Sequence, residues 1–166
     1  MTSSPITDLH PLLVSCEGLE DSMLCELARR IYRDNYLGSK KVGELQAHDS
    51  SLVLFHEDRF EHAFFTSSNR TQFPKKKDVL DRKRVERIRW IKPIIEGRVK
   101  KTACYLLIDR DQGNRHRRLY LAQDHLFVIW LEPRQESGWN FSSAYTAMTM
   151  DVRRYCKSGK RIWVAP

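Results

Sequence analysis

The fold is decided by one stretch, residues 103–145, which reads ACYLLIDRDQGNRHRRLYLAQDHLFVIWLEPRQESGWNFSSAY. Its apolar side chains fall in short runs with a two-residue period, which is typical of β-strands and not of helices. The pattern predicts strands at residues 103–108, 118–122, 126–131 and 139–145. Only Gln123, Asp124 and His125 separate the second strand from the third, so these two are expected to be antiparallel neighbours.

The segments before this stretch show helical spacing. Apolar residues recur at three- and four-residue steps over residues 19–36 and again from Asp78 or Asp81 to residue 95, so a helix is predicted at each place. Pro93 should end or kink the second helix, because proline lacks the backbone N–H that a helix interior needs. Gly97 should close it.

The remaining segments are assigned more briefly. Residues 56–65 are compatible with a short helix, residues 51–55 with a strand or the start of a buried helix, and residues 40–50 with a polar connection. Residues 147–157 have helical spacing, and residues 161–164 could add an edge strand. Helices followed by an antiparallel four- to five-stranded meander sheet define an α+β fold. We expect an N-terminal helical segment over residues 1–48 and an α+β, ribonuclease-like domain over residues 49–166.

The composition is that of a globular protein without cofactor or membrane signatures. The chain has 166 residues, of which 41% are apolar and 30% charged, and no apolar run approaches the length of a membrane span. No secretory signal is recognisable at the N-terminus. The four cysteines form no CxxC pair and no Cys/His cluster, which favours reduced thiols in a cytoplasmic protein over a disulfide frame or a metal site.

The positive charge is concentrated in residues 70–101, which read RTQFPKKKDVLDRKRVERIRWIKPIIEGRVKK. This basic stretch holds thirteen Lys or Arg and four acids, a net charge of +9, whereas residues 1–69 hold six basic and eleven acidic side chains. Such a block favours binding of a polyanion, because Lys and Arg displace the counterions condensed on phosphates. A solvated helix face would explain the same charges without any ligand.

The residues that could cleave a phosphodiester favour a route without a metal. The predicted strands offer no carboxylate or histidine spacing typical of a metal-dependent nuclease. RNA can be cut without a metal, because its own 2′-hydroxyl serves as the nucleophile once a base removes the proton and cations neutralise the phosphorane. Histidine is the natural proton acceptor near neutral pH, and Lys or Arg is the natural clamp.

Several residues fit these roles, and each has a structural alternative. His62 is the candidate base, Lys77 and Arg87 the candidate clamp, and Ser143 and Tyr145 the hydroxyls that would orient phosphate or 2′-OH. Arg84 and Arg87 are one turn apart in the predicted helix and so should share a face. Further RNA contacts are expected from His56, Lys75, Lys76, Arg84 and Trp139. Packing, surface charge and structural hydrogen bonds would account for the same residues.

Four segments in order, HEDRFEHAFF, KKKDVLDRKRVERIRWI, RRLYLAQDHLFVIWLEP and GWNFSSAY, resemble the nuclease superfamily of barnase, EndoU, the tRNA-cleaving colicins and RelE. The resemblance covers residues 51–157 and is nearest to the bacterial and phage-borne toxin branches. It implies a metal-independent endoribonuclease that cleaves tRNA or mRNA and leaves a 2′,3′-cyclic phosphate. The family's early histidine matches His62 and, less well, His56. Its clamp matches Lys77 and Arg87, and its late hydroxyl and aromatic match Ser143 and Tyr145.

Two other classes of function remain open at this stage. A non-catalytic RNA- or DNA-binding module would use the same basic stretch for phosphates and strand aromatics for stacking. A protein-interaction role would use the acidic N-terminal segment, either on a basic partner or over the protein's own basic face. The toxin interpretation adds an acidic antitoxin or immunity protein as a partner, in addition to RNA.

Overall fold

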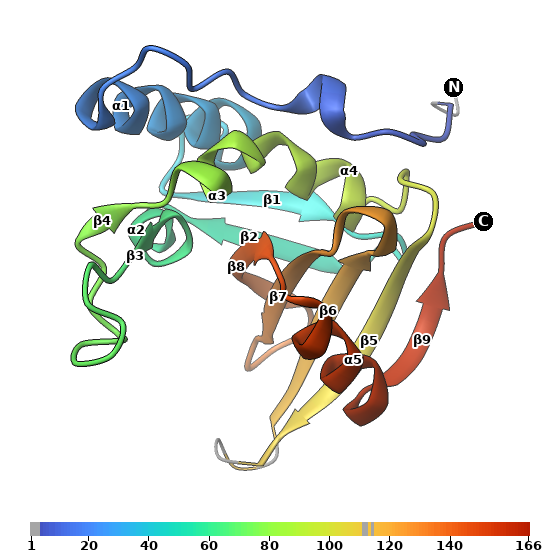
Figure 1. Ribbon diagram of the computed structural model, residues 1–166. Coiled ribbons are helices and arrows are strands. Elements are labelled where there is room, and N and C mark those ends of the chain that lie inside the picture. The colour runs from blue at the N-terminus through green and yellow to red at the C-terminus, as the bar shows by residue number, and fades with distance from the viewer. Residues whose placement is uncertain (1–3, 111–112, 114) are drawn as a thin grey trace.

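A single seven-stranded sheet forms the centre of the protein, with helices on both faces (Figure 1). The computed structural model describes residues 4–110, 113 and 115–166. The strands of the sheet are β1 (Val42–Gln46), β2 (Leu52–His56), β5 (Thr102–Asp109), β6 (Arg115–Ala122), β7 (Phe127–Pro133), β8 (Trp139–Thr146) and β9 (Lys160–Val164). The helices are α1 (Asp21–Tyr32), α2 (Arg59–Phe64), α3 (Arg82–Glu86), α4 (Ile91–Ile95) and α5 (Thr149–Ser158). A separate two-stranded ribbon pairs β3 (Phe65–Thr66) with β4 (Val79–Leu80).

The predicted meander is confirmed as the middle of the sheet. The strand order is β1-β2-β8-β7-β6-β5-β9, so the four strands from β5 to β8 are consecutive antiparallel neighbours. The α+β class is confirmed, but the expected four to five strands are too few. The edge strand β9 pairs with β5, and the hairpin of β1 and β2 joins the other side through a parallel pairing of β2 with β8.

The polar connection expected over residues 40–50 is wrong at Val42–Gln46, which form β1. Its sequence VGELQ holds only two apolar side chains, Val42 and Leu45, so it lacks the two-residue apolar period from which a strand is predicted. Gly43 is required in this strand, since a Cβ there would collide with the carbonyl oxygen of Tyr36. The ambiguous residues 51–55 form β2, and the expected division at residue 48 falls in the turn between β1 and β2.

The long helix predicted up to residue 95 is replaced by α3, a 3-10 turn at Ile88–Trp90, and α4. Asp81 caps the start of α3 by accepting a hydrogen bond from the Arg84 N–H at 3.2 Å. A continuous helix would put the Pro93 ring against the carbonyl of Arg89. The chain avoids this clash by restarting at Ile91, so that Pro93 lies in the first turn of α4.

Two apolar clusters stabilise the sheet, one on each face. The larger cluster unites α1 to α4 with one face, and the smaller cluster packs α5 on the other. Strand β7 supplies both, because Ile129 belongs to the larger cluster and Val128 and Trp130 to the smaller one. This explains the continuous apolar run of β7, which is buried on both faces.

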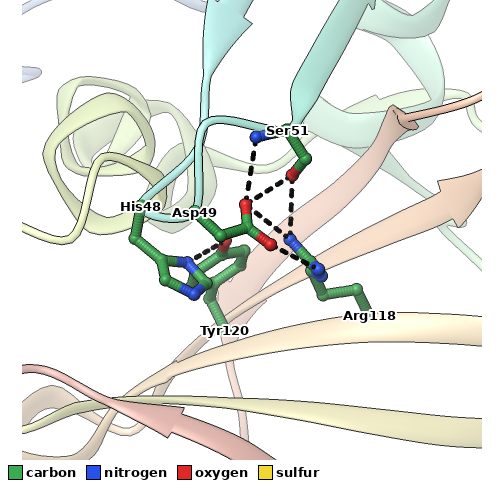
Figure 2. A network of polar contacts seen from close by, with 5 residues as sticks. All are labelled: His48, Asp49, Ser51, Arg118 and Tyr120. Carbon is green, nitrogen blue, oxygen red and sulfur yellow. Dashed lines mark hydrogen bonds and ion pairs between the residues drawn. The ribbon is translucent and has the colours of Figure 1, made fainter.

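A polar network fastens the turn between β1 and β2 to β6 (Figure 2). The Asp49 carboxylate accepts a hydrogen bond from Arg118 at 2.9 Å and others from the Ser51 hydroxyl and N–H at 2.6 and 3.1 Å. His48 Nδ1 lies 2.7 Å from the Tyr120 hydroxyl. These bonds offset the burial of Asp49 and hold the pKa of its carboxyl far below the usual range. Strand β6 therefore holds the hairpin in place although the two do not pair.

The N-terminal segment, residues 4–20, runs along the outside of the helical layer (Figure 1). Ile6 pairs with Val99, and the Val14 N–H donates to the Glu86 carbonyl at 2.8 Å. Leu9 is fully buried in the larger cluster, which also takes residues from α1 and β2. Segments on both sides of residue 48 thus share one core. Among the described residues, no helix combines the length and apolarity that crossing a bilayer requires.

Candidate functional site

An open cleft of about 600 Å³ lies where α2 meets the ends of the central strands. Strands β5 to β8 form one wall, and the end of β2 together with α2 forms the other. The lining residues are His56, Asp58, Arg59, His62, Asp109, Arg115, Arg117, Glu132, Asn140, Phe141, Ser142 and Ser143. The lining combines three arginines, two histidines and a hydroxyl-bearing strand, which makes this cleft the candidate site.

The amphipathic pattern of α2 directs its polar side chains into the cleft. Phe60, Ala63 and Phe64 are buried in the larger cluster, so Arg59 and His62 must lie on the opposite side of the helix. The three- and four-residue steps of the HEDRFEHAFF segment account for this division.

Hydrogen bonds from the α2 side of the cleft reach β8. Arg59 donates to the Ser142 hydroxyl at 2.9 Å. His56, which ends β2 and does not belong to the helix, has its Nε2 at 2.9 Å from Asn140 Oδ1. The two bonds hold α2 and β2 against the strand that carries the candidate hydroxyls.

A bulge in β8 presents two consecutive serines to the cleft. Trp130 of β7 is opposite Ser143 and Leu131 is opposite Phe141, so Ser142 is an extra residue without a partner in β7. Phe141 stays in the core, while both Ser142 and Ser143 line the cleft. Strict alternation, on which sequence reasoning depends, would have placed only one of these serines there.

The imidazole of His62 is neutral at physiological pH. Partial burial of the ring and the positive charges of Arg59, Lys77, Arg84 and Arg117 together lower its pKa to about 4. The side chain is nevertheless exposed on the cleft rim. His62 is therefore an accessible proton acceptor surrounded by cations.

Lys77 and Arg84 flank the cleft without lining it. The pKa of Lys77 is lowered by partial burial and by the neighbouring charges of Arg84, Arg70 and Arg59. Arg84 lies over the Tyr145 ring at 4.9 Å and donates to the Ala63 carbonyl at 3.1 Å. Arg84 is thereby fixed between α2 and β8, with its charge near His62.

Tyr145 itself supports its neighbours. Its hydroxyl accepts a hydrogen bond from Trp130 Nε1 at 3.0 Å and lies 3.2 Å from the Tyr155 hydroxyl. Burial raises the pKa of Tyr145 to about 12. The Tyr145 ring therefore packs against Arg84, and Tyr145 does not line the cleft. Ser143 does line the cleft.

Arg87 is not among the residues that line this cleft, and its side chain contacts other groups than Arg84 does. Helix α3 ends at Glu86, and the chain turns at Arg87. The Arg87 guanidinium donates to the Lys83 carbonyl at 2.8 Å and lies over the Trp90 ring at 5.1 Å.

Three other predicted RNA contacts, Lys75, Lys76 and Trp139, also lie outside the cleft, whereas His56 lines it. Trp139 packs on the core with the Arg118 guanidinium 4.6 Å from its ring, so the ring is not free for stacking. Lys75 and Lys76 are exposed in the loop before β4, where Lys76 lies 3.8 Å from Asp78.

Sequence reasoning missed the arginines and carboxylates that the strands bring in. Arg117 lies 3.0 Å and Arg115 3.4 Å from the Glu132 carboxylate, and the Arg117 guanidinium lies over the Trp130 ring at 4.2 Å. The strands predicted at residues 103–108 and 118–122 leave both arginines outside, but β6 begins at Arg115. The sequence did contain a signal, because two arginines at a two-residue step, Arg115 and Arg117, would lie on the same face of a strand.

Comparison with known proteins gives no identification. No family model, no curated protein and no solved structure matches this chain.

Proposed function

We propose that this protein is a metal-independent endoribonuclease whose active site is the cleft between α2 and the central strands. The observation that carries the proposal is His62, an exposed neutral imidazole surrounded by Arg59, Lys77, Arg84 and Arg117. A base beside several fixed cations is the arrangement that cleavage of RNA through its own 2′-hydroxyl needs.

In the proposed reaction, His62 accepts the proton of a ribose 2′-OH. The resulting oxygen attacks the adjacent phosphorus, and the bond from phosphorus to the 5′-oxygen breaks as that oxygen is protonated. The products are a 2′,3′-cyclic phosphate and a free 5′-hydroxyl. Arg59 and Arg117 line the cleft and would neutralise the charge of the phosphorane, with Lys77 and Arg84 adding to the local field.

The hydroxyls and carboxylates of the cleft take supporting roles in this proposal. Ser143 would donate to a phosphate oxygen or to the 2′-OH. Glu132 holds Arg115 and Arg117 in place through its two ion pairs. Tyr145 holds Arg84 and would act on the substrate only through that arginine.

The proposed substrate is tRNA or mRNA, and the proposed setting is a bacterial or phage-borne toxin. The protein's net charge of +8 would favour an acidic antitoxin or immunity protein as the inhibiting partner. Such a partner would cover the cations around the cleft.

The deciding experiment is cleavage of total RNA and of defined oligonucleotides in excess EDTA. Wild-type protein should give discrete fragments with cyclic phosphate ends. The His62→Ala variant should be slower by about 10²–10⁴-fold. The His116→Ala variant is the matched control, because His116 is exposed on β6 and does not line the cleft.

A single 2′-deoxy nucleotide at the cleaved position tests the chemistry independently of any mutation. Its introduction should abolish cleavage at that position while binding persists. Cleavage of the deoxy substrate, or full activity of His62→Ala, would refute the mechanism. A gel shift without any product would identify the cleft as that of a non-catalytic RNA-binding module.

A further inference from the structure

We propose that Asp8, His10 and His125 form a binding site for a divalent transition-metal ion, with zinc as the expected occupant. The ion would tie the N-terminal segment to the turn between β6 and β7. This site is separate from the candidate active site and does not depend on the proposed ribonuclease activity.

The fold brings the three residues together from distant parts of the chain. Asp8 and His10 flank Leu9, whose side chain is fully buried, so the backbone between them is anchored to the core. His125 ends the 3-10 turn Gln123–His125 that joins β6 to β7. The pairing of Ile6 with Val99 fixes the path of the segment just before Asp8.

The spacing of the donor atoms is close to that of a tetrahedral site. One ligand atom from each residue lies within 4.8 Å of the other two. Asp8 Oδ1 lies 2.7 Å from His10 Nδ1 and 3.9 Å from His125 Nε2. Zinc bonds of about 2.0–2.1 Å in a tetrahedron place donors about 3.3 Å apart. Side-chain adjustments of about 0.6 Å in these two Asp8 distances would reach that spacing, and the His10 and His125 donors lie within 4.8 Å of each other.

His125 supplies the second, independent reason to expect a ligand. Its side chain is only 9% exposed, yet Nδ1 has no hydrogen-bond partner among the described residues. Its Nε2 is directed at Asp8 but is too far away for a hydrogen bond. Leaving a buried polar ring unsatisfied costs free energy. Coordination of an ion through Nε2 would give that nitrogen the partner that Asp8 is too distant to supply, while Nδ1 would still lack one.

The donor set selects the class of ion. Two imidazoles and one carboxylate match zinc and its neighbours, whereas magnesium and calcium prefer oxygen ligands alone. Three protein ligands leave a fourth position for water. The ring of His125 is held in place by Trp90, at 5.0 Å between centroids, so one ligand is oriented before the ion binds.

The test is titration of chelator-treated, full-length protein with Zn²⁺ in competition with a chromogenic chelator. Wild type should bind one ion. His10→Ala and Asp8→Asn, which alter exposed side chains and should not disturb folding, should each weaken binding at least about tenfold. His116→Ala, another exposed histidine, is the matched control and should bind as wild type does. Co²⁺ in place of Zn²⁺ should give the visible bands of a four-coordinate site in wild type and His116→Ala but not in His10→Ala or Asp8→Asn.

Thermal unfolding provides the second readout. Zn²⁺ should raise the Tm of wild type and of His116→Ala but not that of His10→Ala or Asp8→Asn, because the ion binds the folded state. Absent binding, or equal binding by wild type and both ligand variants, would overturn the site. Since RNA cleavage is assayed in EDTA, either result leaves the proposed ribonuclease mechanism to be judged separately.

Discussion

At the scale of single residues, the proposed mechanism depends most on His62, its proton acceptor. Its ring is exposed on a rim where restricted hydration and four cations disfavour the protonated form. An imidazole with a pKa of about 4 is almost fully in the basic form at neutral pH. A phosphate bound among the same cations would offset part of their effect and would raise this pKa, which couples substrate binding to proton acceptance.

This pKa predicts the acid limb of the pH profile. The base is lost when His62 is protonated, so kcat/KM should stay high as the pH falls through 6.5, the usual histidine value, and should decline near pH 4. Arg59→Gln removes one neighbouring charge and should move both the NMR titration of His62 and the acid limb to higher pH. A measured His62 pKa near 6.5 in wild type would contradict the effect of the four surrounding cations.

The two neighbouring arginines of the basic stretch should behave differently. Arg84→Gln removes a charge next to His62 and should slow cleavage about tenfold or more. Arg87→Gln is the matched control, because that guanidinium contacts Lys83, Glu86 and Trp90 away from the cleft. Steady-state kinetics with a short RNA and a Tm for each variant would check the difference. Equal losses of activity at unchanged Tm would place Arg87 in the site after all.

At the scale of the elements, the hairpin of β1 and β2 is held by side chains as well as by strand pairing. Arg118 of β6 is 8% exposed at its side chain and is neutralised by Asp49, which lies in the turn of that hairpin. The bonds of this network join a turn and a strand that are far apart in sequence (Figure 2). The network therefore fastens the hairpin to the meander in addition to the pairing of β2 with β8.

Asp49→Asn should reduce the free energy of unfolding by about 2 kcal/mol, because it leaves the buried Arg118 without a counter-charge; the partial exposure of Asp49 keeps the loss below that of a fully buried pair. Asp124→Asn, which breaks the exposed pair with Lys101, should cost less than about 0.5 kcal/mol. Urea unfolding of wild type and both variants measures these two losses in the free energy of unfolding. Similar losses would mean that the network adds nothing beyond a surface pair.

The same pair predicts how stability responds to acid. The Asp49 carboxyl has a folded-state pKa far below its usual value of 3.8. Its contribution is therefore complete above the unfolded pKa and is lost as the pH falls through the folded one. The Asp49→Asn variant should accordingly lose less stability than wild type below pH 4 in urea titrations. A parallel acid dependence of the two proteins would contradict the depressed pKa.

At the scale of the whole molecule, the N-terminal 48 residues and the rest share one core. Tyr32 donates from α1 to the His56 carbonyl at 2.7 Å, and Tyr36 donates to the Ile88 carbonyl at 2.5 Å. Both rings contact Phe55 of β2, and Tyr36 stacks on it at 4.7 Å between centroids. The cleft wall formed by the end of β2 and by α2 is supported from behind by this layer.

A chain of residues 49–166 should consequently fail to fold as a cooperative unit. It would expose the apolar face that α1 covers and would leave β2 as an open edge without β1. Circular dichroism, thermal unfolding and NMR dispersion, each compared with residues 1–166, would test this. A cooperative transition and well-dispersed spectra for the short chain would instead support two separable parts.

Patterns of local sequence were sufficient for much of the fold. The four central strands follow from their two-residue period, and α1 follows from its apolar stripe. The placement of Arg59 and His62 on one side of α2 follows from the burial of Phe60, Ala63 and Phe64. Candidates such as His62 and Ser143 could be named because chemistry restricts the residue types that accept a proton or contact a phosphate.

The sequence by itself thus determined the α+β class, the meander and the polar side of α2, because each depends on residues that are neighbours in the chain. Only the tertiary structure decided which distant segments lie next to each other. It paired β2 with β8 in parallel, inserted the bulge at Ser142, and brought Arg117 and Glu132 opposite α2. It also gave the Arg84 and Arg87 side chains different contacts, with Tyr145 and with Trp90. Such contacts depend on register and on packing between distant segments, which side-chain periodicity along one segment does not encode.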